Sequence, residues 1–292
     1  GKGIIAAIIV PCGKRMNLEQ IISANVAAAL AEDVGSGDLT AQLIPAGRAG
    51  TATVISREAA LLCGRAWFDE CFRQVDPAVE IFWLVKEGEQ VEANQRLCEI
   101  SGPARALLTA ERTALNFLQT LSAVATKTRT YVEAAHGHKA KIMDTRKTLP
   151  GMRHALKYAV TVGGGYNQRI GLFDGILIKE NHIMAAGSIE AVMTQAQALA
   201  TPGVTIQIEV ESLEELQRAL DAGARLILLD NMSNEQMAEA VALTAGRAEL
   251  EASGGVNLET VAGIAATGVD RISIGGLTKD VKAVDLSMRF RM

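Results

Sequence analysis

The sequence predicts an α/β protein in which a small sheet domain precedes a C-terminal α/β barrel, and three observations predict it. Six short β-branched, apolar runs end on a polar residue or a glycine pair, and helical stretches separate them. These ends recur at intervals of about 21 to 35 residues, close to the roughly 30 residues of a βαβ unit. The first third of the chain lacks this repeat and alternates instead like a compact sheet.

Helices and strands are expected in mixed order in this first third. Leu18 to Asp33 carries one apolar stripe and predicts a helix, which glycines at 35 and 37 break. The next elements are predicted as strand, helix, strand, turn and strand, at Thr51–Ser56, Arg65–Gln74, Val79–Val85, residues 86–89 and Gln90–Ile100. Pro103 then stands in the first turn of a long helix that reaches about Ala135.

The barrel repeat starts at Lys139 and continues to the C-terminus. Six strands are clear in it, whereas an ordinary barrel of this type has eight. The barrel is therefore either incomplete, with six to seven strands, or completed by other segments. We predict an N-terminal extension at 1–16, a first domain at 17–126 and the barrel at 127–292.

The extension is apolar from Gly3 to Cys12, which is far shorter than the roughly 20 residues of a membrane span. Lys14 and Arg15 follow it in place of a small-residue cleavage site. We therefore expect an extension ahead of the domain rather than an export signal, and we leave it out of the fold argument.

Composition excludes some classes of function. A net charge of −4 and a pI near 5.7 argue against bulk nucleic-acid binding, so an anionic ligand requires a local cationic cluster. A 49% hydrophobic content over 292 residues fills two ordinary cores. The four cysteines lack CxxC or CxxH spacing, which predicts free thiols in a reducing, cytoplasmic setting.

Each barrel unit ends on a residue type that carries chemistry. The six ends are Asp144, Lys179, Glu209, Asp230, Ser253-Gly254-Gly255 and Gly275-Gly276. In α/β barrels the active site lies at the carboxyl ends of the strands, where the loops converge. Packing alone does not account for an acid, a base or a glycine pair at the same place in every unit, so we predict an enzyme.

Cations gather at three of the predicted loops. Thr145, Arg146 and Lys147 follow the first barrel strand, Arg169 closes a glycine-rich loop, and Lys179 ends the second strand. Three or four cations at one mouth predict a polyanionic ligand that carries carboxylates, phosphates or both. The alternative is that these cations only form ion pairs with Asp144, Glu209 and Asp230.

Two acids end consecutive strands, so Glu209 and Asp230 are expected to project into the same mouth. Carboxylates there bind ribose hydroxyls, hold Mg²⁺ through its water shell or stabilise a developing cation. Glu211 shares the side of the strand with Glu209 and is the fallback candidate. A purely structural role, in which the acids cap the following helices, is the alternative.

The two glycine segments each precede a predicted helix, the first of them starting near Leu258. Backbone amides at such junctions form a phosphate cradle, and two junctions in successive final units favour this reading over simple tight turns. The four histidines give weaker evidence about function than the acids, cations and glycines. We see no zinc or iron site, and a hydrogen-bonded structural role is favoured for His182.

These stretches together resemble the quinolinate phosphoribosyltransferases, also called nicotinate-nucleotide pyrophosphorylases (carboxylating). The resemblance runs in order from about Leu18 to Phe290. DTRKT-x-PG-x-R and LIKENH are its most specific parts, and the matching segments are TAERTALNFLQ (109–119), MDTRKTLPGMR (143–153), KYAVTVGGG (157–165), ILIKENHI (176–183), IEVESLEEL (208–216), LLDNM (228–232), EASGG (251–255) and ISIGGLTK (272–279).

The resemblance implies conversion of quinolinate and phosphoribosyl pyrophosphate to nicotinate mononucleotide, with Mg²⁺ and release of pyrophosphate and carbon dioxide. It implies a sandwich-like α+β first domain, to which a segment near Val284–Phe290 returns, and a homodimer in which Arg112 reaches the neighbouring site. Lys147, Glu209 and Asp230 are the implied catalytic residues. Substrate binding is implied for these three and for Arg112, Thr145, Arg146, Gln168, Arg169, Lys179, Ser253, Gly254, Gly255, Ser273, Ile274, Gly275 and Gly276.

One departure from the family pattern bears on the substrate. Gln168 stands where an imidazole is common, and an amide donates a hydrogen bond but carries no charge. Lys279 and Gly276 also depart, in ways that we expect to be benign. The alternatives kept open are a related pyrophosphorylase of a molybdenum-transport locus that acts on another base, and a non-catalytic barrel that senses a ligand.

Overall fold

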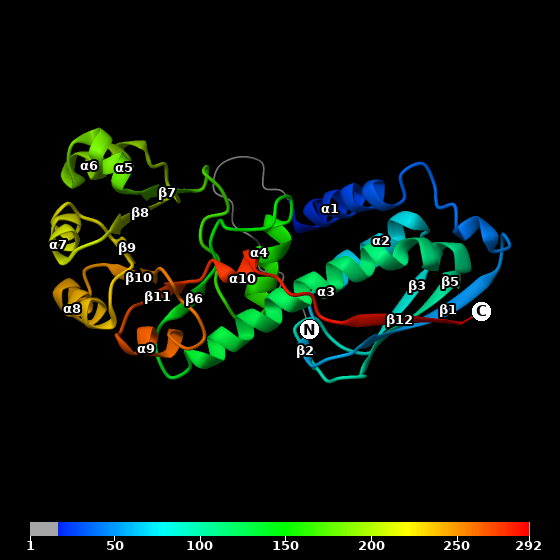
Figure 1. The fold of residues 1–292 in the computed structure, drawn as a ribbon. Coiled ribbons are helices and arrows are strands. Elements are labelled where there is room, and N and C mark those ends of the chain that lie inside the picture. The colour runs from blue at the N-terminus through cyan, green and yellow to red at the C-terminus, as the bar shows by residue number, and fades with distance from the viewer. Residues whose placement is uncertain (1–16, 292) are drawn as a thin grey trace.

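The computed structural model describes residues 17–291, which form two units that share one long helix (Figure 1). The extension predicted at residues 1–16 lies outside the described residues. The first unit contains α1 (Leu18–Asp33), η1 (Ala41–Leu43), β1 (Ala49–Ser56), β2 (Ala60–Leu61), α2 (Arg65–Val75), β3 (Glu80–Trp83), β4 (Gln90–Val91) and β5 (Arg96–Pro103). The predicted helix at Leu18–Asp33 is confirmed, and Asn17 caps it by accepting a hydrogen bond from the Glu19 amide.

The predicted strand at Gln90–Ile100 is wrong as a single element. Asn94 adopts a left-handed conformation with φ of 67°, and the turn around it divides the segment into β4 and β5. Only β5 then joins the main sheet of the first unit, whereas β4 pairs with the short β2.

This main sheet has the strand order β12-β1-β5-β3, and all its neighbours are antiparallel. β12 (Leu286–Arg291) comes from the far end of the chain and pairs with β1 along its length, from Ser56 opposite Leu286 to Thr51 opposite Arg291. Ala52 and Val54 are buried beneath the helices, while the alternate residue Thr51 is exposed on the uncovered face.

The shared helix, α3 (Ala104–Ala134), crosses from the first sheet to the barrel unit (Figure 1). It packs closely against α4, because a Cβ added at Gly163 would lie 2.5 Å from the Ala125 carbonyl oxygen and 2.6 Å from Thr128 Cβ. Glycine at 163 thus permits an approach that fixes the middle of α3 on the barrel unit.

The second unit is a six-stranded parallel sheet with helices between its strands, so the predicted count of six strands is confirmed. The strand order is β6-β11-β10-β9-β8-β7. The strands are β6 (Lys141–Met143), β7 (Gly175–Ile178), β8 (Thr205–Val210), β9 (Leu226–Asp230), β10 (Glu249–Ser253) and β11 (Arg271–Ser273). The helices are α4 (Arg153–Val162), α5 (Glu180–Ala186), α6 (Ile189–Leu199), α7 (Leu213–Asp221), α8 (Asn234–Thr244), α9 (Val261–Ala266) and α10 (Gly276–Lys279).

β6 and β7 are the two edges of this sheet, and no ladder joins them within residues 17–291. A single parallel bridge from Tyr166 to Met143 extends the sheet beyond β6. The barrel is therefore incomplete in the described part of the chain. None of the helices described here is long and apolar enough to cross a membrane.

Candidate active site

The carboxyl ends of the central parallel strands bring the predicted residues to one edge of the sheet. Asp230 ends β9 and lies opposite Ser253, the last residue of β10. Glu209 lies on the neighbouring β8, and Lys179 directly follows β7. Because these strands run parallel and adjacent, their ends form one continuous mouth.

Lys179 and Glu209 form an ion pair across this mouth, with 3.3 Å between Nζ and Oε2. The ion-pair alternative therefore holds for this cation, although the Lys179 side chain keeps 52% of its surface exposed. His182 Nδ1 accepts a hydrogen bond from the Lys179 amide at 3.0 Å, which agrees with the structural role favoured for this histidine.

A group of acids surrounds the same edge. The charge of Glu180, followed by partial desolvation and the charges of Glu215, Asp230 and Glu209, raises the pKa of Glu211. The carboxylates at the ends of β8 and β9 therefore lie near enough to interact, which gives this side of the mouth a negative potential.

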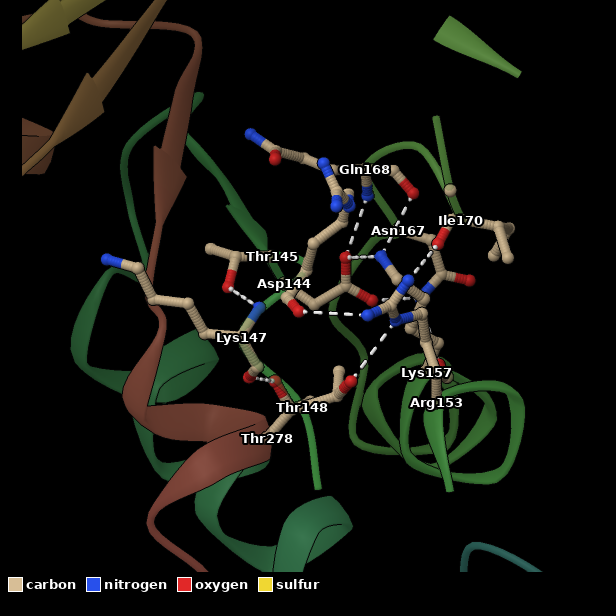
Figure 2. A network of polar contacts seen from close by, with 12 residues as sticks. Asp144, Thr145, Lys147, Thr148, Arg153, Lys157, Asn167, Gln168, Ile170 and Thr278 are labelled. Atoms are coloured by element: carbon tan, nitrogen blue, oxygen red, sulfur yellow. Dashed lines mark hydrogen bonds and ion pairs between the residues drawn. The ribbon is translucent and has the colours of Figure 1, made fainter. Parts of the chain in front are cut away.

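Asp144 directly follows β6 but does not face the mouth, because it is completely buried in an ion pair with the equally buried Lys157 of α4 (Figure 2). Its carboxylate also accepts hydrogen bonds from Asn167 Nδ2 at 2.6 Å and from the Gln168 amide at 2.8 Å. Lys157 Nζ donates in turn to the Gln168 carbonyl at 3.0 Å. The pair thus ties the loop after β6 to the loop that carries Arg169.

Burial opposes both charges of this pair. It raises the pKa of the Asp144 carboxyl and lowers the pKa of the Lys157 ammonium, while each partner's charge acts in the opposite direction. Sequence reasoning missed this role of Lys157, since a lysine within a helix is ordinarily solvated. Its place among apolar neighbours on the buried side of α4 was the available signal.

The loop after β6 is held from several sides. Arg153 donates to Thr148 Oγ1 at 3.1 Å and to the Arg146 carbonyl at 3.3 Å, and Thr278 Oγ1 donates to the Lys147 carbonyl at 2.7 Å (Figure 2). The Lys147 side chain extends away from the buried pair in this view and is exposed. The backbone is therefore fixed while the ammonium remains free to meet a ligand.

Two arginines, Arg146 and Arg169, lie close together on the loops that the buried pair joins. Arg146 Nε is buried and finds no hydrogen-bond acceptor among residues 17–291. Desolvation, followed by the charge of Arg146, lowers the pKa of Arg169, whose Nη1 donates to the Gly175 carbonyl at 2.9 Å. No carboxylate within this described range forms an ion pair with Arg146, Lys147 or Arg169.

The last glycine pair packs directly on the cationic loop. A Cβ at Gly275 would lie 3.0 Å from Lys147 Cδ and 3.7 Å from Thr145 Oγ1. Within the described chain, the amides of Gly275 and Gly276 have no protein acceptor. Their N–H groups are therefore free to bind an anion beside Lys147.

The other glycine segment has the same property, since the amides of Gly254 and Gly255 also lack an acceptor within residues 17–291. Gly254 has φ of +106°, and a Cβ there would lie 2.8 Å from Asn231 Cγ, so only glycine fits. The helix expected to start near Leu258 begins later, at Val261, because a turn at Asn257–Thr260 comes first.

With this geometry in place, comparison with known proteins decides the family. Residues 38–122 match the quinolinate phosphoribosyl transferase N-terminal domain, and residues 124–289 match the C-terminal domain of the same enzymes. The chain belongs to the quinolinate phosphoribosyltransferase family.

Individual relatives agree. A probable nicotinate-nucleotide pyrophosphorylase (carboxylating) of Bacillus subtilis is 42% identical over 257 residues, covering 88% of this chain and 89% of that protein. A quinolinate phosphoribosyltransferase (decarboxylating) of Nicotiana tabacum is 41% identical, covering 89% and 80%. The structure of the nicotinate-nucleotide pyrophosphorylase from Francisella tularensis superposes with a TM-score of 0.90 at 45% identity, covering 94% of this chain and 97% of that one.

Gln168, one of the three residues expected to depart from the family pattern, is part of a buried network. Its Nε2 donates to the carboxylate of Glu251, which is completely buried in β10 and also accepts from Gln207 Nε2 at 3.0 Å. Desolvation raises the pKa of Glu251. Sequence reasoning treated Glu251 as part of an apolar run; an acid inside such a run was the missed signal.

Arg112 is the predicted residue that the fold does not bring to this mouth. It is exposed on α3, fifteen residues before Lys127, whose Nζ contacts the Gly276 carbonyl at 2.8 Å. At 1.5 Å per residue that separation is about 22 Å along the helix. Arg112 therefore lies remote from the mouth of its own chain.

Among the described residues, no cluster of metal-ligating side chains is already formed. Within residues 17–291, no group of three or more histidine, cysteine, aspartate or glutamate side chains is arranged to hold an ion. The neighbouring acids Glu209, Asp230 and Glu211 supply oxygens of the kind that Mg²⁺ accepts, and Mg²⁺ needs few protein oxygens because it keeps several waters.

Proposed function

We propose that this protein transfers the phosphoribosyl group of phosphoribosyl pyrophosphate to quinolinate with loss of carbon dioxide, giving nicotinate mononucleotide for NAD biosynthesis. Family membership over both domains supports this reaction. The order of charges around the mouth also fits it. The cations Arg146, Lys147 and Arg169, which form no ion pair within residues 17–291, suit the dicarboxylate, the acids suit the ribose and metal, and the glycine amides without a protein acceptor suit the phosphate.

The observation that carries the proposal is the pair of arginines. Desolvation, followed by the charge of Arg146, lowers the pKa of Arg169, so the two guanidinium groups lie close together, and Arg146 Nε is buried without an acceptor among residues 17–291. Leaving a buried donor unpaired costs about 1–3 kcal/mol. A ligand with two adjacent carboxylates removes both penalties, and quinolinate is such a ligand.

The acids act on the sugar. We assign Glu209 and Asp230 to the ribose hydroxyls and to the positive charge that grows on the anomeric carbon as its bond to pyrophosphate breaks. Mg²⁺, when bound with the substrate, neutralises part of the pyrophosphate charge. Lys147 lies beside Gly275 and is placed to do the same from the protein side.

The nitrogen of the pyridine ring then supplies the electron pair for the new bond to the anomeric carbon. The ring becomes a pyridinium, so the carboxylate beside the nitrogen leaves as carbon dioxide and its bonding electrons stay on the ring carbon. That carbon takes up a proton, for which Lys147 or Lys179 is the proposed source. The contribution of the protein is chiefly positioning and charge neutralisation.

We also propose a cytoplasmic homodimer in which Arg112 completes the site of the partner subunit. The remoteness of Arg112 from its own mouth and its exposure on α3 support this arrangement. Mixing Arg112→Ala subunits with Lys147→Ala subunits tests it, because a shared site predicts partial recovery of activity. Heterodimers that form but recover nothing would exclude it. Three buried free thiols in the described part, Cys63, Cys71 and Cys98, support a reducing compartment.

One assay tests the reaction. Purified protein with Mg²⁺, phosphoribosyl pyrophosphate and quinolinate is expected to release carbon dioxide and to form nicotinate mononucleotide in equal amounts. Parallel reactions with nicotinate and with other heteroaromatic acids test the influence of Gln168. Turnover of another base without turnover of saturating quinolinate would contradict the proposal.

A further inference from the structure

Lys127 connects the long helix to the loop that carries the last glycine pair. Its Nζ donates hydrogen bonds to the Gly276 carbonyl at 2.8 Å and to the Asp280 carbonyl at 3.0 Å. These two carbonyls lie at the beginning of α10 and just past its end. The Lys127 ammonium therefore ties both ends of this short helix to α3.

The helix that carries Lys127 is a firm support. Its neighbours Ala125 and Thr128 are buried and contact α4 at Gly163, where no Cβ fits. Lys127 is half-buried, so its ammonium is partly desolvated and its hydrogen bonds to carbonyls are charge-assisted. The position of the Gly276 peptide is thus set by α3 as well as by the barrel.

In the turn at residues 274–277, some backbone groups bond to other protein groups and others do not. The Ile274 amide donates to the Met143 carbonyl at 3.0 Å, and the Leu277 amide donates to the Ile274 carbonyl at 3.3 Å. Lys127 Nζ donates a hydrogen bond to the Gly276 carbonyl. The amides left without a protein acceptor in the described chain are those of Gly275 and Gly276.

We propose that Lys127 is a positioning residue for the phosphate end of the site. It touches neither substrate. By holding the Gly276 and Asp280 carbonyls, it fixes α10 on α3 and so keeps the adjacent glycine segment, which packs beside Lys147, in place for phosphate oxygens. This inference rests on the proposed function. It adds that the shared helix α3 of each chain tunes that chain's own affinity for the phosphorylated substrate.

The test separates binding of the two substrates. Lys127→Met is expected to raise the KM for phosphoribosyl pyrophosphate about tenfold, as for loss of one charge-assisted hydrogen bond, while the KM for quinolinate changes by less than about twofold. Lys127→Arg, which can still donate to both carbonyls, is expected to recover most of the loss. Lys282→Met is the matched control, because Lys282 is exposed on the same connection and makes no hydrogen bond or ion pair within residues 17–291.

A binding measurement keeps the inference independent of turnover. Calorimetry with ribose 5-phosphate is expected to give a Kd for Lys127→Met about tenfold above that of the parent and of Lys282→Met. Parallel increases in both KM values, or an unchanged Kd for ribose 5-phosphate, would overturn the positioning role. If the parent binds ribose 5-phosphate but does not turn over quinolinate, the proposed function fails while the role of Lys127 is still tested.

Discussion

Lys157→Met is the substitution with the largest expected effect on stability. Lys157 and Asp144 are both completely buried, so the substitution leaves a carboxylate without a counter-charge inside the protein. Two neutral donors remain on that carboxylate, Asn167 Nδ2 at 2.6 Å and the Gln168 amide at 2.8 Å. Removing one partner of a buried pair costs about 3–5 kcal/mol, and the two remaining donors place this case within that range rather than above it.

Urea denaturation followed by circular dichroism measures this cost. The double variant Lys157→Met/Asp144→Asn removes both charges, and its carboxamide keeps the shape of the Asp144 carboxylate, so it is expected to recover a large part of the loss. Lys139→Met is the exposed control. Lys139 pairs with Asp270 at 2.7 Å but keeps 58% of its side chain exposed, so its loss is expected to cost at most about 1 kcal/mol.

The reasoning fails if Lys157→Met destabilises the protein no more than Lys139→Met does. It also fails if the double variant is as unstable as the single one, because the cost would then come from lost packing of the lysine stem. Activity is expected to fall in Lys157→Met even under conditions where it stays folded, since the pair joins the two loops that carry Arg146 and Arg169.

Three further outcomes are expected. Burial raises the pKa of Glu251 above its unfolded value near 4.3, so the protein loses stability as pH rises from that value through the folded pKa. In urea titrations at increasing pH, Glu251→Gln should therefore gain stability relative to the parent, and a constant difference would contradict this. Gly254→Ala, with φ of +106° and a clash with Asn231, should lower activity at least about tenfold, whereas Gly255→Ala, with open space around it, should lose less. Burial raises the pKa of Cys71 to about 12, so at pH 8 about one Cys71 thiol in ten thousand is ionised. Alkylation mapped by mass spectrometry should therefore be far slower in the native protein than in urea at the buried thiols Cys71, Cys63 and Cys98.

Local patterns in the sequence were sufficient for much of the fold. The apolar stripe of α1 gave its bounds, and the alternation of apolar runs and helices gave all six parallel strands. Where one local signal was weak, the prediction erred. The turn at Asn94 contains neither glycine nor proline, so β4 and β5 were merged into one strand.

The candidate site divides in the same way. The strand ends Lys179, Glu209 and Asp230 are brought together because parallel strands place their carboxyl ends at one edge, which the repeat already implies. The burial of Lys157 could be read from its apolar neighbours, but its pairing with Asp144 was not predictable, because the helix and the strand that carry them meet only in the folded state. The proximity of Lys127 to Gly276 spans 149 positions and leaves no local pattern.

The pairing of β12 with β1 has a consequence for the time at which the first sheet forms. β1 lies between β12 and β5, so a nascent chain without its last strand presents β1 as an open edge. The ribosome adds Leu286–Arg291 after nearly all of the barrel has been made. The domain that is synthesised first is thus completed last, and its exposed edge must be kept from other nascent chains throughout synthesis of the barrel.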